Sequence, residues 1–174
     1  VYDEKLQLNP GAERMLSSVQ AAGIKTLLVS GGFTFFTEKL KARLGLDRAY
    51  ANTLEVDGAG LLTGSVLGDI VDGAAKAHWL RTWADELGVA PHATIAIGDG
   101  ANDLPMMAVA GAGLAFNAKP TVRESARRSG CRSRKARPIR SNIVSDAATV
   151  RTAGSTPRAA AAMMKTACRR ASRG

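Results

Sequence analysis

The chain has 174 residues, of which 45% are apolar, 24 are Lys or Arg and 15 are Asp or Glu. This length suits one domain of about 100–200 residues, and the sequence contains no run of about 18 apolar residues, which excludes a transmembrane helix. Residues 1–126 carry 11 basic and 14 acidic residues, whereas residues 127–174 carry 13 basic residues and a single acid, Asp146. The formal net charge of +9 therefore describes neither part. The contrast is typical of a folded body followed by a basic tail.

The first predicted elements are a helix, a strand and a second helix. Asn9-Pro10 offers an N-cap and a proline at the first helical position, and Gly23 ends this helix. Ile24–Val29 is a short, apolar, β-branched run, as expected of a strand buried on both faces. Ser30–Gly32 then forms a turn into the next helix, which begins near Phe33 and ends at Gly45.

The pattern then changes to that of a β-hairpin. Leu54–Val56 and Leu62–Val66 are separated by the turn pair Asp57-Gly58. A helix containing Trp79 follows and ends at Gly88. We interpret the hairpin as a small insertion between two helices.

The remaining elements complete an alternation of strands and helices. Thr94–Ile97 is a second buried strand, 104–109 a short helix and Gly113–Phe116 another strand. Strands that alternate with helices predict βαβ units, and hence an α/β fold with a doubly wound parallel sheet. The pattern stops near Ala126, so we predict a truncated core over 1–126 and an irregular tail beyond it.

Polar residues follow the first and second buried strands, where ligands bind in doubly wound sheets. The hydroxyl of Ser30 and the backbone N–H groups of Gly31 and Gly32 can cradle an anion at the start of a helix. The alternative is that these residues form only a tight turn between strand and helix.

The second cluster is Gly98-Asp99-Gly100-Ala101-Asn102-Asp103. Two carboxylates four positions apart suit Mg²⁺, which prefers oxygen ligands, although an Asx-rich turn with Asn102 as a helix cap is the alternative. Lys76 lies on the first turn of the Trp79 helix. Its ammonium can neutralise a phosphoryl group only if that helix begins at the same sheet edge, and otherwise it is a solvated lysine.

Taken together, these motifs resemble the haloacid dehalogenase superfamily of phosphatases, and within it the phosphoserine phosphatase family. The order is SGGF, then a lysine 46 residues past Ser30, then GDGAND, whose Asp99 lies 23 residues past that lysine. LLVSGGFTFF, ANTLEV and AIGDGANDLPMMAVAG are also similar to that family, and the resemblance spans about Leu8 to Ala126. It implies hydrolysis of O-phosphoserine to serine and phosphate, a step of serine biosynthesis, with Mg²⁺ as cofactor and a small phosphorylated substrate.

The resemblance also implies roles for individual residues. Ser30-Gly31 matches the motif that holds the transferring phosphoryl group, and Lys76 matches the catalytic lysine that offsets its charge. Asp99 matches a Mg²⁺ ligand, and Asp103 supports the metal site and the lysine. Asn102 matches a position that contacts the substrate.

One motif of this superfamily is missing from the sequence. Its chemistry starts with an aspartate nucleophile in a DxDx(T/V) motif, and this chain contains no DxD. The cap that recognises the substrate is also expected to be absent. We therefore predict that the chain is inactive alone. Two alternatives stay open: a related phosphatase for another small phosphorylated metabolite, and a nonenzymatic phosphate-binding or nucleic-acid-binding remnant.

The tail, residues 127–174, admits two interpretations. A reading-frame shift near Ala126 would produce its Arg-, Ser- and Ala-rich composition, and such a segment would be disordered. A basic nucleic-acid-binding tail is the competitor, but the tail has no aromatic residue to stack on bases. We favour the frameshift and expect neither nucleic acid nor a membrane as partner. No secretory leader is visible, so we expect a cytoplasmic location, and the oligomeric state stays open.

Overall fold

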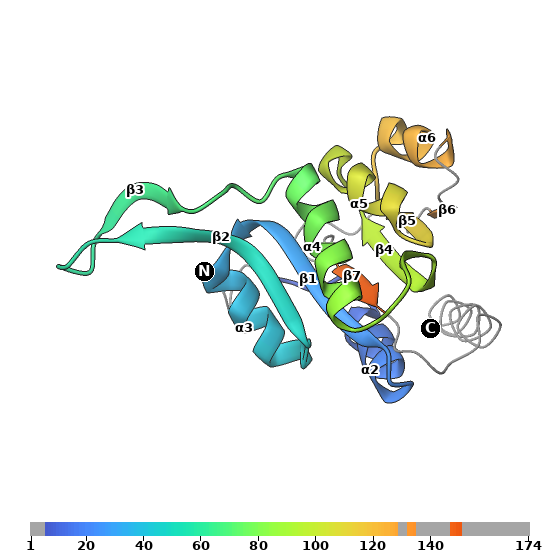
Figure 1. Cartoon of the computed structure of the whole chain (residues 1–174), viewed down its shortest axis with the longest axis horizontal. Coiled ribbons are helices and arrows are strands. Elements are labelled where there is room, and N and C mark those ends of the chain that lie inside the picture. Colours follow the sequence, from blue (N-terminus) through green and yellow to red (C-terminus); the bar gives the residue numbers. More distant parts are fainter. Residues whose placement is uncertain (1–5, 129–131, 135–146, 151–174) are drawn as a thin grey trace.

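The computed structural model describes residues 6–128, 132–134 and 147–150, and these form a sheet with helices packed on it (Figure 1). The strands are β1 (Lys25–Phe33), β2 (Arg48–Val56), β3 (Leu62–Leu67), β4 (Thr94–Gly98), β5 (Ala112–Phe116), β6 (Arg132–Arg134) and β7 (Ala147–Val150). The helices are α2 (Ala12–Ala21), α3 (Thr34–Leu44), α4 (Gly73–Glu86), α5 (Leu104–Val109) and α6 (Pro120–Arg128), with 3-10 turns η1 (Pro91–Ala93) and η2 (Ala101–Asp103). None of these described helices has the length and apolarity that a membrane crossing needs.

The strand order is β3-β2-β1-β7-β4-β5-β6. β1 pairs parallel with β2, and β4 pairs parallel with β5. β7 is antiparallel to both of its neighbours, β1 and β4. Since both neighbours run opposite to the same strand, β1 and β4 run in the same direction and their carboxyl ends lie at one edge of the sheet.

Helices cover both faces of the sheet. Successive side chains of a strand point to opposite faces, so neighbouring residues of β1 enter different cores. Leu28 packs in a core with Leu16 of α2 and Leu40 of α3. Its neighbours Leu27 and Val29 lie in a second core, which is shared with residues of α4, α5 and α6: Leu80, Trp83, Ala84, Met106, Met107, Val122 and Ala126. This arrangement confirms the predicted α/β, doubly wound fold class.

The predicted hairpin is confirmed, but its first strand is longer than expected. β2 begins at Arg48 and serves both as a neighbour of β1 in the sheet and as a partner of β3. The connection is the five-residue loop 57–61, in which the carboxylate of Asp57 accepts hydrogen bonds from the backbone N–H groups of Ala59 and Leu61, both at 2.9 Å.

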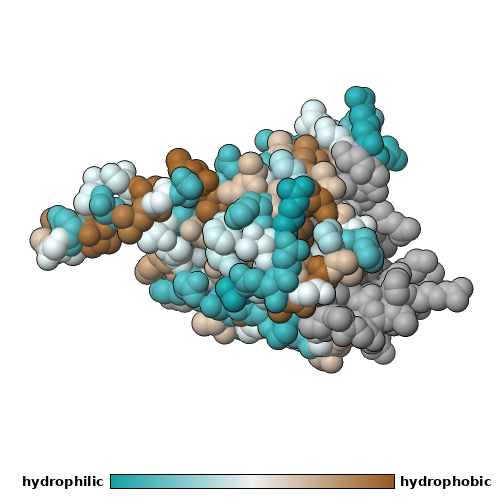
Figure 2. Space-filling view, in the orientation of Figure 1, coloured by the Kyte–Doolittle hydropathy of each residue, from teal (hydrophilic) through white to brown (hydrophobic). Residues whose placement is uncertain are grey.

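The hairpin extends away from the body as an arm (Figure 1). It presents apolar side chains to solvent along its length (Figure 2). The exposed large apolar residues of the arm and its return are Val56, Leu61, Leu62, Leu67 and Ile70. The arm therefore contributes little to either core.

Two predicted boundaries were wrong. Helix α2 is capped by Gly11, whose φ of 83° lies in the left-handed region, and the predicted cap, Asn9, contributes only its backbone carbonyl, at 3.0 Å from the N–H of Ala12. Strand β1 continues through Ser30–Gly32 to Phe33, so the predicted turn is part of an extended segment and α3 begins at Thr34. At Gly11 the left-handed conformation, which glycine adopts readily, changes the backbone path in a way that side-chain periodicity does not report.

The described part of residues 127–174 also differs from the predicted irregular tail. β6 pairs parallel with β5, and β7 lies in the middle of the sheet. The pattern of apolar residues did not predict β6 and β7. Strands of three or four residues can pair through backbone hydrogen bonds without alternating apolar and polar side chains. The other predictions for this tail fall on residues outside the described ranges.

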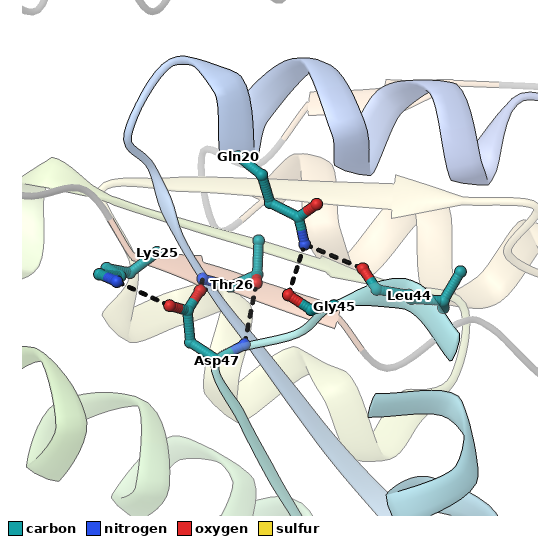
Figure 3. A network of polar contacts seen from close by, with 6 residues as sticks. All are labelled: Gln20, Lys25, Thr26, Leu44, Gly45 and Asp47. Carbon is teal, nitrogen blue, oxygen red and sulfur yellow. Dashed lines mark hydrogen bonds and ion pairs between the residues drawn. The ribbon is translucent and has the colours of Figure 1, made fainter. Parts of the chain in front are cut away.

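A polar network ties α2, β1 and the start of β2 together at the amino edge of the sheet (Figure 3). The carboxylate of Asp47 accepts hydrogen bonds from Lys25 Nζ at 2.7 Å, Thr26 N at 2.8 Å and Thr26 Oγ1 at 2.9 Å. Burial raises the pKa of Asp47, but the hydrogen bonds from Lys25 and Thr26 outweigh it, so the pKa lies below its usual value. Gln20 Nε2 donates to the carbonyls of Leu44 and Gly45 in the same region.

Candidate phosphate and metal site

The Ser30–Gly32 segment is a bulge in β1 at the carboxyl edge of the sheet. Between two paired positions, β1 advances from Val29 to Phe33 while β2 advances only from Tyr50 to Asn52. β1 therefore has two extra residues here, and a bulge leaves such residues outside the ladder. Ser30 Oγ accepts a hydrogen bond from the backbone N–H of Gly32 at 3.1 Å. Gly31 and Gly32 are exposed to solvent, as an anion-binding backbone must be.

The acidic loop after β4 is folded around the side chain of Asp103, which is fully buried. Its Oδ2 accepts hydrogen bonds from Asp99 N at 3.0 Å and Gly100 N at 2.9 Å. A Cβ at Gly98 would collide with this carboxylate, so the loop requires glycine at that position. The glycine and the buried carboxylate together determine the shape of the loop.

Lys76 reaches the same carboxylate from α4. Its Nζ lies 2.8 Å from Asp103 Oδ1, and both side chains are 0% exposed. The helix is placed by Asp72, which caps it through a hydrogen bond from Ala75 N at 2.8 Å. Neither charge of a buried pair is stable without its partner, so α4 and the acidic loop are held in one relative position.

The segment that leads into α4 connects the bulge with the acidic loop. A Cβ at Gly31 would lie 3.4 Å from the carbonyl oxygen of Val71, and a Cβ at Gly73 would lie 2.9 Å from that of Asn102. Val71 to Gly73 thus passes from one polar cluster to the other. The structure thus links the bulge to the acidic loop through the segment that leads into α4, and the gathering of Ser30, Lys76 and Asp99 around one phosphoryl group stays a prediction.

The two predicted metal ligands differ in their surroundings. The carboxylate of Asp99 is half-buried, and among the described residues it has no hydrogen-bond partner. Both oxygens of Asp103 are instead engaged by Lys76 and the loop backbone. Within the described ranges, no three His, Cys, Asp or Glu side chains are arranged to hold a metal ion. Asp99 alone fits a cation that takes one carboxylate and completes its shell with water and phosphate, as Mg²⁺ does.

Asn102, the predicted substrate contact, lies exposed at the outer surface of the loop. A Cβ at Gly100 would meet its side-chain oxygen. Gly100, two positions before Asn102, therefore leaves room for this amide to fold back over the loop. Its predicted contact with a substrate stays a prediction.

Sequence reasoning missed Asn52, a buried amide that bonds to the bulge. Its Nδ2 donates to the carbonyl of Gly31 at 2.8 Å. The available signal was an asparagine two residues before the predicted strand Leu54–Val56, but nothing in that pattern showed that β2 lies beside β1.

Comparisons with a family model and with curated proteins point to the same group of enzymes. The family model of haloacid dehalogenase-like hydrolases matches residues 1–108. The phosphoserine phosphatase of Polaromonas sp. (strain JS666) is 51% identical over 130 residues, which cover 72% of this chain and 55% of that enzyme. The chain spans about half the length of the curated relatives it matches.

Two similar solved structures belong to the same group of enzymes as these curated relatives. The unliganded probable phosphoserine phosphatase from Vibrio cholerae matches with a TM-score of 0.65 at 48% identity, over 69% of this chain and 37% of that chain. A phospho-aspartyl intermediate analogue of phosphoserine phosphatase matches with a TM-score of 0.63 at 40% identity, over 68% of this chain and 56% of that chain.

Proposed function

The chain belongs to the haloacid dehalogenase-like hydrolases, and we propose that it forms the phosphate-holding part of a Mg²⁺-dependent phosphoserine phosphatase. The substrate class is a small phosphorylated metabolite, O-phosphoserine first of all. In this proposal the products are serine and phosphate, the reaction belongs to serine biosynthesis, and the enzyme acts in the cytoplasm. Residues 1–126 supply the catalytic core, and residues 127–174 take no part in the chemistry.

The observation that supports this function best is the rim formed by the bulge and the Lys76–Asp103 pair. Ser30 and Gly31 offer a hydroxyl and a backbone amide to the oxygens of a phosphoryl group, and Lys76 supplies positive charge beside them. Positioning and charge neutralisation are the main contributions of a protein to phosphoryl transfer. Asn102 contacts the part of the substrate that extends beyond the rim.

The cation in this proposal is Mg²⁺, and Asp99 is its ligand from this chain. When bound, the ion would offset negative charge on the phosphoryl oxygens. Asp103 acts indirectly, because it orients the backbone of Asp99 and the ammonium of Lys76. The chain itself contributes the orientation of these groups and the exclusion of water around the buried pair.

The nucleophile of the reaction comes from outside this chain. A solved relative is a phospho-aspartyl intermediate analogue, whereas this sequence contains no DxD motif. In the proposed reaction an aspartate attacks phosphorus and the serine oxygen leaves. Water then cleaves the acyl-phosphate, which releases phosphate and regenerates the aspartate.

The test is to restore the missing part. The chain is joined to the preceding half of the Polaromonas relative, and release of phosphate from O-phosphoserine is measured with and without Mg²⁺. We expect Mg²⁺-dependent release that falls about 10–1000-fold in Ser30→Ala, since one preorganised hydrogen bond to the phosphoryl group is lost.

Ser18→Ala is the matched control, because Ser18 lies on α2 and its hydroxyl donates to the backbone carbonyl of Arg14 on the same helix. Restored protein that folds but releases no phosphate, or that is equally active after Ser30→Ala, would contradict the proposal. Faster hydrolysis of another small phosphate ester would instead favour the related phosphatase.

A further inference from the structure

One buried amide connects the Ser30 bulge with the segment that leads into α4. Asn52 is 6% exposed. Its Nδ2 donates to the carbonyl of Gly31 at 2.8 Å, and its Oδ1 accepts from the backbone N–H of Val71, also at 2.8 Å. The donor and the acceptor of this side chain are thus used on two different segments, both of which line the rim.

The bulge explains why a side-chain donor is needed. β1 has two residues more than β2 between the pairs Val29–Tyr50 and Phe33–Asn52. Such extra residues lose their partners in the backbone ladder. The amide of Asn52 donates to the carbonyl of Gly31 in place of a ladder partner.

This hydrogen bond also determines the direction of the next N–H group. All described peptide bonds are trans, so the C=O and the N–H of the peptide between Gly31 and Gly32 point in opposite directions. With the carbonyl of Gly31 turned toward Asn52, the N–H of Gly32 points away from β2. There it donates to Ser30 Oγ at 3.1 Å. The orientation of the serine oxygen therefore follows from the bond that Asn52 makes.

We propose that Asn52 is a positioning residue that orients the Gly31–Gly32 peptide, and through it the Ser30 hydroxyl, for the phosphoryl group. This inference rests on the proposed function. The bond to Val71 adds a second effect, because the same amide holds the bulge beside the chain that enters α4. Asn52 touches neither the phosphoryl group nor the metal in this proposal.

Two substitutions separate its contacts. Asn52→Asp keeps an acceptor for Val71 but places a carboxylate oxygen against the carbonyl of Gly31. Asn52→Leu has a similar size, removes both bonds and adds no charge, so a shared effect cannot come from repulsion of phosphate. The matched control is Gln20→Glu, which makes the same amide-to-carboxylate change against the carbonyls of Leu44 and Gly45 at the opposite edge of the sheet (Figure 3).

The first measurement needs no ligand. In ¹⁵N–¹H spectra of the purified whole chain, we expect both Asn52 variants to move the Gly32 amide resonance. The temperature dependence of its proton shift should rise to that of an unbonded amide, while Gln20→Glu leaves it unchanged. A Gly32 resonance that is the same in native chain and Asn52→Asp would overturn the proposal.

The second measurement titrates the same samples with inorganic phosphate. We expect the dissociation constant to rise about tenfold in both Asn52 variants, because one charge-assisted hydrogen bond loses its preorganisation. Gln20→Glu should bind as the native chain does. Equal affinity in all four proteins would overturn the inference. A native chain that binds no phosphate at Gly31 and Gly32 would instead count against the proposed function, and the ligand-free spectra would still decide the role of Asn52.

Discussion

At the scale of single residues, Asp103 organises the acidic loop and the position of Lys76, in addition to any part it has in a metal site. Its carboxylate accepts from two backbone N–H groups of its own loop and from Lys76. A buried carboxylate with this many donors organises its surroundings, since buried polar groups are hydrogen-bonded. The shape of the acidic loop and the position of the lysine thus depend on the same two oxygens.

Asp103→Asn is expected to lower the free energy of unfolding by about 3–5 kcal/mol, because it removes the negative charge that lies 2.8 Å from the buried ammonium of Lys76. Urea denaturation measures this loss. Asp85→Asn, an exposed site on α4, is the control and should change stability by no more than about 0.5 kcal/mol. The double variant with Lys76→Met should recover part of the loss, and a cost that is simply additive would argue against the ion pair as its cause.

Asp47 gives a pH-dependent prediction. Its pKa is lowered in the folded chain, so its stabilisation is present above the usual aspartate range and is lost as the pH falls through and below about 4. The side chain is 26% exposed, so the effect should be about 1 kcal/mol or less. We expect Asp47→Asn to be less stable at neutral pH and to lose less stability on acidification. Urea denaturation at pH 7, 5 and 3 tests this, and parallel pH profiles would contradict it.

At the scale of elements, the position of α4 is determined by close backbone approach as well as by the ion pair. Its first residue, Gly73, lies against the backbone of Asn102 in η2. Helix α4 also packs on the sheet through Trp79, whose ring stacks on Tyr50 of β2 with centroids 4.0 Å apart. The position of Lys76 on this helix therefore depends on where β2 and η2 lie.

Gly73→Ala should destabilise the chain by about 1–3 kcal/mol, because the new methyl group meets a backbone carbonyl that cannot move freely. This outweighs the gain of up to about 1 kcal/mol in helix propensity. Gly58→Ala is the control, since a Cβ there has nothing within 4 Å. Thermal denaturation of both variants measures the difference. Equal melting temperatures would contradict the prediction and show that η2 shifts to make room for the methyl group.

At the scale of the whole molecule, the sheet joins two groups of parallel strands through β7, which runs antiparallel between them. β7 pairs with Lys25–Leu28 and Thr94–Ile97, the amino-terminal parts of its neighbours. The rim itself is formed by the carboxyl ends of β1 and β4 and by the start of α4. In the proposed function these residues hold the phosphoryl group, and the sequence contains no DxD motif to supply an acidic nucleophile.

For this reason the isolated chain should hydrolyse O-phosphoserine negligibly, with a rate lower by about 10⁴–10⁶ than that of the restored protein, as for removal of a covalent nucleophile from other catalytic units. Phosphate release with purified chain and Mg²⁺ is the measurement. Asp99→Asn should leave the background rate unchanged. Robust Mg²⁺-dependent turnover by the native chain would contradict the prediction and show that another group acts as nucleophile.

The sequence by itself determined the alternation of strands and helices, the hairpin and the family, since apolar periodicity, glycine positions and the order of SGGF, Lys76 and GDGAND are local features. It did not determine that Ser30–Gly32 is a bulge rather than a turn, because a bulge is defined by the register of β1 against β2. Nor did it reveal Asn52 or the full engagement of Asp103. Those features depend on hydrogen bonds between segments 19 to 27 residues apart, and only the folded chain brings such donors and acceptors together.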